Sequence, residues 1–248
     1  MTDRRQTIVF LHATRLSGAQ WRAQADALGE EFRCVLVDLP GHGAAAGRPF
    51  TLEGAASEVA TTIAGLPDGR AVLVGLSLGG YVAMEVAARW PERVAGLVIA
   101  GATVDPVGLV GVPFRTLAIA YRRVPATWLA RSQTWTFRRR YRAELVDPIV
   151  EGGWWFRGGS AAVSALIGHR FRPSLARYGG PILLVNGQRD LLFRVGERAF
   201  AATGGDVRRV LIRGAGHRSN LDQPEAFTAV VGRFARSLPP AGESAAGR

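Results

Sequence analysis

"VLVGLSLGGYVAM", residues 72–84, is the stretch of sequence that decides the fold. An apolar run typical of a buried strand leads into a serine bracketed by glycines, and a helix-like pattern follows. A Gly-x-Ser-x-Gly turn between a strand and a helix is so tight that small residues must flank the serine, whose hydroxyl then projects above the sheet edge. The pattern therefore predicts a nucleophile elbow at Ser77, with Gly75 and Gly79 relieving the crowding.

Two other interpretations of this stretch are a plain glycine-rich turn with an incidental serine and a phosphate-binding loop. The strand before the serine and the helix after it favour the elbow over the plain turn. The phosphate loop fails because the chain has neither a GxxxxGK[ST] nor a GxGxxG pattern and contains no lysine.

The segments around the elbow alternate between strand and helix patterns. Continuous apolar strands, each followed by a helix pattern, predict an α/β fold whose mainly parallel sheet is covered by helices on both faces. The predicted strands are 7–11, 34–38, 71–76, 94–100, 182–187 and 207–214, and the predicted helices are 18–28, 52–65, 80–90 and 224–238.

This alternation stops between residues 103 and 173, where segments rich in Pro, Trp and Arg have helical spacing and no convincing strand. A helical insertion within one domain explains the interruption without a second core. We predict an α/β core formed by residues 1–102 and 174–238, a helical cap insertion at 103–173 and a disordered tail at 239–248.

The chain carries a formal net charge of +11, and all 31 basic residues are arginine. Ala and Gly are also abundant, so we interpret the arginine excess as the codon bias of a GC-rich genome and not as a sign of an anionic macromolecular partner. Arginines concentrate between residues 115 and 172 near several tryptophans, which can indicate single-stranded nucleic-acid binding but which we interpret as an amphipathic lid. Most of these arginines are expected to face solvent, and one or two to meet a carboxylate on the substrate. We predict no nucleic-acid partner.

The composition is that of an ordinary globular chain, with 48% hydrophobic and 21% charged residues. No apolar run approaches the roughly 18 residues that span a bilayer, and the first residues lack a signal-type apolar region. Cys34 is the sole cysteine, which excludes an intrachain disulfide and thiolate-based metal sites. We expect a cytoplasmic protein without a membrane partner, and the oligomeric state stays open.

A serine hydroxyl is a poor nucleophile at neutral pH, so a base must accept its proton and an acid must orient that base. His217 follows the last predicted strand, where a loop can hold an imidazole over the carboxyl edge of the sheet. Asp190 follows the strand at 182–187 and precedes His217. Asp206 and Asp222 are rivals, but Asp206 precedes a strand at the opposite edge and Asp222 suits the N-cap of the last helix.

The chain resembles the α/β-hydrolase superfamily over nearly its whole length, and in particular the small, lidded serine esterases of that superfamily. The resemblance rests on the order Ser, Asp, His and on the fragments "IVFLHATRLSGAQW", "CVLVDLPGHG", "GLSLGG", "GQRD" and "GAGH". The resemblance implies that residues 103–173 form a cap whose Trp and Phe side chains line an acyl or alcohol pocket, for which we name Trp154 and Trp155. It also implies that the family's first antiparallel hairpin is absent.

The resemblance further implies that the backbone N–H groups of Thr14 and Leu78 form the oxyanion hole. The family usually has His-Gly after this strand, whereas the chain has His12 and Ala13, and alanine penalises a positive φ. We interpret His12 as bracing the loop, His42 as part of the "PGHG" turn, and His169 in the insertion as a solvated structural histidine.

These inferences predict a serine hydrolase that cleaves a carboxylic ester, thioester or lactone of a small molecule through an acyl-enzyme, with no metal and no organic cofactor. A serine at the elbow disfavours the dehalogenase and epoxide-hydrolase branches, which use a carboxylate there. Carbon–carbon bond hydrolysis or acyl transfer by the same triad stays open, as does a non-catalytic ligand-binding protein on this fold.

Overall fold

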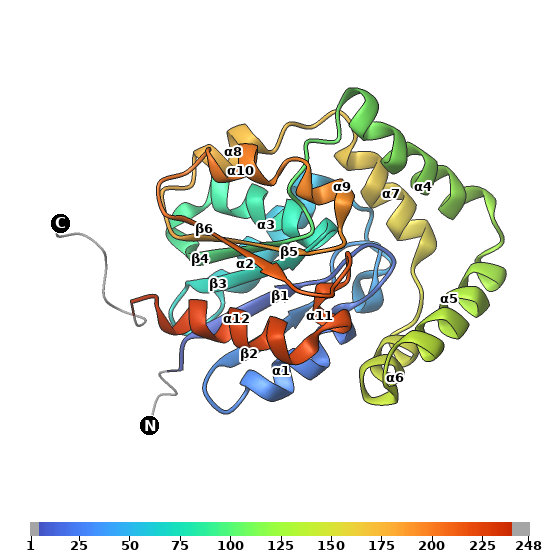
Figure 1. The fold of residues 1–248 in the computed structure, drawn as a ribbon, viewed down its shortest axis with the longest axis horizontal. Helices are drawn as coiled ribbons and strands as arrows, with labels where there is room; N and C mark the ends of the chain where they lie inside the picture. The colour runs from blue at the N-terminus through green and yellow to red at the C-terminus, as the bar shows by residue number, and fades with distance from the viewer. Residues whose placement is uncertain (1–4, 240–248) are drawn as a thin grey trace.

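The computed structural model describes residues 5–239. Its centre is a six-stranded sheet in the order β2-β1-β3-β4-β5-β6, in which every neighbouring pair is parallel (Figure 1). The strands are β1 Thr7–Leu11, β2 Arg33–Val37, β3 Ala71–Leu76, β4 Val94–Ala100, β5 Ile182–Gly187 and β6 Val207–Ile212. The predicted parallel sheet is confirmed, and each strand lies within two residues of its predicted bounds.

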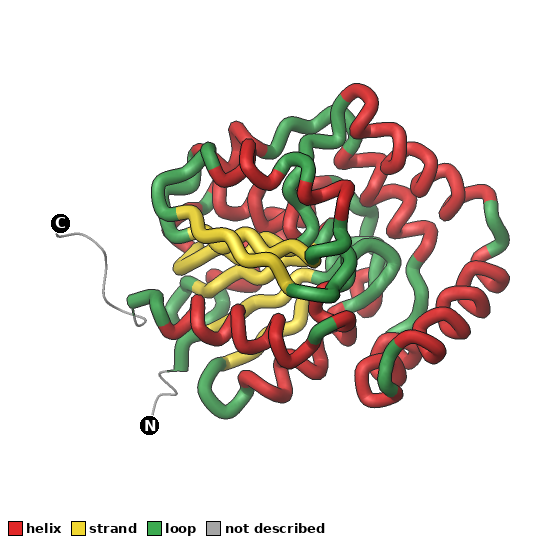
Figure 2. Tube along the Cα trace, viewed as in Figure 1, coloured by secondary structure: helices red, strands yellow, loops and turns green. Residues whose placement is uncertain are grey.

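Helices cover both faces of the sheet, as Figure 2 shows in red and yellow. One face carries α1 Arg22–Leu28, α11 Ser219–Asp222 and α12 Pro224–Arg236. The other carries α2 Leu52–Ala64, α3 Leu78–Arg89, α8 Arg172–Ala176 and α10 Glu197–Ala201. Each face has its own apolar core because strand side chains alternate: Leu73 packs on the α3 side, and its neighbours Val72 and Val74 pack on the α12 side.

The predicted helices at 52–65 and 224–238 are present as α2 and α12, which end slightly earlier, at Ala64 and Arg236. The other two predicted helices differ at their starts. The segment predicted as one helix at 18–28 divides into a 3-10 turn, Gly18–Trp21, followed by α1. Helix α3 starts at Leu78, directly after Ser77, and not at residue 80. Its early start matters for the site, because the first N–H groups of the helix then lie next to the serine.

The long segment between β4 and β5 is helical, as the sequence predicts. Besides α8 it contains α4 Gly111–Arg123, α5 Ala126–Arg140, α6 Ala143–Glu151 and α7 Phe156–Leu166. Figure 1 shows α4 to α7 grouped beyond one end of the sheet. Short helix α9, Leu191–Arg194, follows β5. The domain boundaries stay a prediction, and residues 240–248 of the predicted tail lie outside the described residues. Within 5–239, no helix has the length and hydropathy to cross a membrane.

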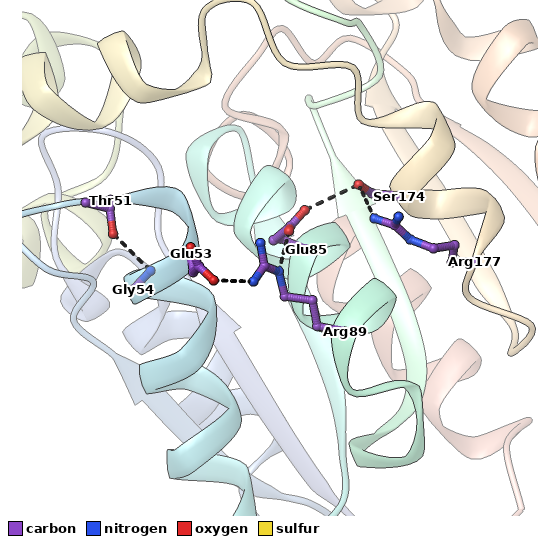
Figure 3. A network of polar contacts seen from close by, with 7 residues as sticks. All are labelled: Thr51, Glu53, Gly54, Glu85, Arg89, Ser174 and Arg177. Atoms are coloured by element: carbon purple, nitrogen blue, oxygen red, sulfur yellow. Dashed lines mark hydrogen bonds and ion pairs between the residues drawn. The ribbon is translucent and has the colours of Figure 1, made fainter.

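A polar network ties the helices of the α3 face together (Figure 3). Arg89 donates from Nε to Glu85 at 2.5 Å and from Nη1 to Glu53 of α2 at 2.6 Å. Glu85 also accepts from the Ser174 hydroxyl of α8, which accepts in turn from Arg177. Because Glu85 is buried, these contacts compensate its carboxylate and link α2 and α8 to the helix that follows Ser77.

Candidate active site

Ser77 occupies a strained turn between β3 and α3. Its φ of 54° and ψ of −114° are rare for a non-glycine residue, and its N–H donates to the Ala100 carbonyl at 2.8 Å. A Cβ at Gly75 would collide with the Gly79 carbonyl, and one at Gly79 would collide with the Leu11 carbonyl. The glycines are therefore required by close backbone approach, and the surrounding structure holds the serine in its strained conformation.

His217 and Asp190 meet at the carboxyl ends of the strands. Asp190 follows β5 and His217 follows β6, and Nδ1 of His217 lies 2.8 Å from Oδ2 of Asp190. The aspartate side chain is only 6% exposed, whereas the imidazole is 37% exposed. An ionised carboxylate can only accept, so Nδ1 carries the proton and Nε2 is left as an acceptor. His217 also lines both cavities that contain Ser77.

The two rival carboxylates are engaged elsewhere. Asp222 accepts hydrogen bonds from Arg140, Tyr141 Oη and the Gly216 N–H. Asp206 pairs with Arg208 at the surface. The expected N-cap role of Asp222 is wrong, because the residue before α12 is Gln223 and Asp222 lies at the end of α11. Asp222 instead fixes the loop immediately before His217.

The other histidines have structural surroundings. Nε2 of His12 accepts the Leu39 N–H at 3.0 Å, and Nδ1 faces the Ala13 carbonyl at 2.9 Å. Burial, assisted by neighbouring His42, lowers the pKa of His12 to about 3, so its ring is neutral. Burial also lowers the pKa of His42, whose Nε2 accepts the Arg15 N–H at 3.3 Å. His169 is exposed.

Thr14 and Leu78 flank Ser77 from two different segments. Thr14 lines both cavities, and Leu78 lines the smaller one. Within residues 5–239 neither backbone N–H donates to a protein acceptor, so both are available to an oxyanion. The expected penalty at Ala13 does not arise, because the non-glycine residues of this range with positive φ are Arg15 and Ser77. The Ala13 N–H donates to Gln20 Oε1 at 2.8 Å, which fixes the loop.

Two adjoining cavities share Thr14, Arg15, Ser77 and His217 as lining residues. The smaller, of about 310 Å³, is mostly apolar, and the larger, of about 570 Å³, is rich in arginine. Besides Leu78 of α3, the apolar side chains of the smaller cavity come from α4, α7 and α9 and are Pro113, Phe114, Leu117, Val163, Leu166, Leu192 and Phe193. The insertion therefore contributes directly to the surface next to the serine.

Trp154 and Trp155 line neither of these two cavities. Both line a separate cavity beside Phe50 and Arg48. The Trp154 ring packs against Phe137 at 5.0 Å and its Nε1 donates to Thr134, so it belongs to the interior of the insertion. The walls of the apolar cavity next to Ser77 are instead formed by Phe114 and its neighbours, at positions that tryptophan content alone does not indicate.

Sequence reasoning also missed Gly101 and Phe193. Gly101 has a φ of +55°, and a Cβ there would lie 2.9 Å from Nδ1 and Cε1 of His217. Phe193 stacks on the His217 ring with centroids 4.6 Å apart. Beneath them, buried Asn186 accepts the Gly101 N–H and donates to Thr103, which donates to the Phe193 carbonyl. In the sequence, Gly101 could have been noticed only as a glycine that follows a predicted strand, and Phe193 only as an aromatic residue close after Asp190.

Replacing Gly101 with alanine is expected to lower kcat/KM for a p-nitrophenyl ester at least about tenfold and to lower the free energy of unfolding by roughly 1–3 kcal/mol, since the new methyl group strains the backbone and displaces His217. Gly108→Ala is the matched control: φ is +54° there, but nothing lies within 4 Å of the added carbon. It should lose stability and keep activity. Equal loss of activity in both variants would contradict the contact with His217.

No group of three or more His, Cys, Asp or Glu side chains in residues 5–239 is arranged to hold a metal ion. The arrangement that is present brings a serine hydroxyl and an imidazole to the same two cavities, which the Thr14 residue also lines. Such an arrangement suits acyl transfer to and from a serine hydroxyl.

Residues 8–230 match the model of the alpha/beta hydrolase family. Among named proteins, the chain is 26% identical over 247 residues to a pimeloyl-[acyl-carrier protein] methyl ester esterase of Nitrosospira multiformis, with 92% of the chain and 94% of the relative covered. It is 28% identical over 250 residues to an esterase of the same name from Yersinia enterocolitica, with 92% and 93% covered.

Among solved structures, a thermophilic esterase from Thermogutta terrifontis with malate bound superposes with a TM-score of 0.78 at 26% identity, covering 94% of this chain and 90% of that one. An enol-lactonase from Burkholderia xenovorans superposes with a TM-score of 0.76 at 24% identity, covering 94% and 92%. The second likeness shows the shared fold alone.

Proposed function

This chain belongs to the alpha/beta hydrolase family and is an ester-cleaving serine hydrolase, and on that premise we propose that Ser77, His217 and Asp190 form its catalytic triad. One observation carries the assignment. The serine sits on a strained turn and opens into the same two cavities as His217, whose Nδ1 lies 2.8 Å from buried Asp190.

In the first half of the reaction, Ser77 Oγ attacks the ester carbonyl while Nε2 of His217 accepts its proton. The carboxylate of Asp190 holds the reactive tautomer and stabilises the imidazolium. The Thr14 and Leu78 N–H groups receive the charge that develops on the carbonyl oxygen, and one such donor contributes about 3 kcal/mol in comparable sites. His217 then returns the proton to the leaving alcohol.

In the second half, water attacks the acyl-enzyme with His217 again as base, which releases a carboxylic acid and restores Ser77. The apolar cavity between α4 and α7 would receive an aliphatic part of the substrate and exclude water from the acyl-enzyme. The substrate class we propose is a carboxylic ester of a small molecule, in keeping with the names of the relatives.

A fluorophosphonate probe tests the nucleophile. Wild-type protein is expected to bind the probe covalently at Ser77, because a phosphonate reacts with a serine that has an adjacent base. Ser77→Ala should abolish labelling with the fold intact by circular dichroism. Ser57→Ala, an exposed serine of α2, is the control and should label like wild type. Labelling of Ser77→Ala at the wild-type level would refute the assignment.

A further inference from the structure

The larger cavity beside Ser77 has an unusual distribution of charge. Four arginines line it, and the carboxylate of Asp222 is the lone acidic side chain among its lining residues. Arg15 follows β1, Arg140 ends α5, Arg189 precedes Asp190, and Arg218 follows His217. Four separate segments thus bring positive charge to the larger cavity.

Arg140 is neutralised, because its guanidinium pairs with Asp222 at 2.8 Å. Arg15 and Arg218 have no such partner: neither forms an ion pair with a carboxylate of residues 5–239. Their hydrogen-bond acceptors are neutral. Arg15 donates to Tyr121 Oη at 2.7 Å and to Gln133 Oε1 at 3.1 Å.

Arg218 is held in a similar way by aromatic side chains. Its Nε donates to Tyr141 Oη at 3.0 Å, and its guanidinium carbon lies 4.5 Å from the centre of the Phe137 ring. These contacts fix the plane of the guanidinium while leaving its charge uncompensated. Both arginines are therefore oriented by uncharged groups and keep their positive charge available to the cavity.

Arg15 is half-buried, which makes the missing countercharge costly. Its Nε is buried without a hydrogen-bond partner. Burial lowers the pKa of its guanidinium, and the positive charge of Arg218 lowers that pKa further. Removing a guanidinium from water without an anion is unfavourable. An anionic ligand in the cavity would offset that cost for both arginines at once.

Backbone strain singles out the same position. Arg15 and Ser77 are the non-glycine residues of 5–239 with positive φ, at 61° and 54°. The Arg15 N–H donates to buried His42, which holds this conformation. Strain of this kind persists where the surroundings enforce it and is concentrated at functional sites. The position of Arg15 is thus built into the loop that also carries Thr14.

Ser77 lines both this cationic cavity and the apolar cavity of Phe114 and Leu117. Arg15 also lines both cavities, whereas Arg218 lines only the cationic one. Building on the proposed hydrolysis at Ser77, we propose that the substrate is an ester with a carboxylate on one side of the scissile bond, bound by Arg15 and Arg218, and an apolar group on the other. Planar guanidinium groups match a carboxylate in shape and charge.

Matched ester pairs test this subsite. In the first arm, monomethyl esters of straight-chain dicarboxylic acids, from succinate to adipate, are compared with methyl esters of the corresponding monocarboxylic acids, which places the charge on the acyl side. In the second arm, acetyl esters of ω-hydroxycarboxylic acids are compared with alkyl acetates, which places it on the alcohol side. The measured quantity is the ratio of kcat/KM for the charged ester to that for its neutral partner.

Wild-type protein should prefer the charged ester in one arm, and Arg218→Gln should lower that ratio at least about tenfold, the effect expected for a charged hydrogen bond. Arg15→Gln should act in the same direction. If Arg15→Gln does not fold, Arg15→Lys is used instead. It keeps the positive charge but lacks the planar guanidinium, so it should lower the ratio less than Arg218→Gln does. Arg122→Gln removes one exposed charge from α4 and should leave the ratio unchanged.

An unchanged ratio in both Arg15 and Arg218 variants would overturn the subsite, as would a wild-type preference for the neutral ester in both arms. Failure of the hydrolytic function looks different, because then wild-type protein would turn over neither member of any pair and Ser77 would not react with the phosphonate. Retained phosphonate labelling and neutral-ester hydrolysis with no charge preference would therefore refute the anion subsite alone.

Discussion

Ser77→Ala is expected to lower kcat for ester hydrolysis by about a million-fold, and His217→Ala by nearly as much, because each removes one half of a single proton-coupled attack. The double variant Ser77→Ala, His217→Ala should be no slower than either single variant by more than a few-fold. Rates measured with a p-nitrophenyl ester over protein-free buffer, at enzyme concentrations high enough to detect residual turnover, provide the comparison.

His169→Ala is the control for the histidine, since that side chain is exposed in the insertion. It should retain wild-type kcat, and the thermal unfolding midpoints of all variants should stay close together. Losses that multiply in the double variant would mean that Ser77 and His217 act in separate steps. A fully active His217→Ala would remove the imidazole from the mechanism.

Asp190→Asn is expected to reduce kcat by about 10³- to 10⁴-fold, less than the loss of the serine or the histidine. The amide keeps the size of the carboxylate but cannot stabilise the imidazolium, and its NH₂ group can impose the wrong tautomer on His217. Because Asp190 lies 2.8 Å from Nδ1, the effect should appear in kcat with little change in the unfolding midpoint.

Asp222→Asn is the matched control for Asp190. It removes one carboxylate from the same region, but Asp222 bonds Arg140, Tyr141 and the Gly216 N–H and makes no hydrogen bond to His217. Since an amide oxygen can still accept some of these hydrogen bonds, kcat should fall less than about tenfold. A larger loss in Asp222→Asn than in Asp190→Asn would identify Asp222 as the acid of the triad.

The sequence by itself determined the sheet, the elbow and the three candidate triad residues. Strand and helix periods are local properties, and parallel strands place their carboxyl ends along one edge. Residues in the loops that follow β3, β5 and β6 are therefore brought to one edge of the sheet. The Gly-x-Ser-x-Gly pattern and the positions of Asp190 and His217 after predicted strands were therefore enough to name the three residues.

The tertiary structure alone decided which side chains surround the triad. Phe114 lines the cavity next to Ser77, whereas Trp154 packs inside the insertion. Which of these side chains lines the cavity depends on how α4, α5 and α7 pack on the core. Gly101 and Arg218 likewise acquire their roles through contacts between distant segments. Local patterns leave such long-range packing undetermined, since many arrangements bury the same apolar surface and the chosen one depends on shape and charge across the whole molecule.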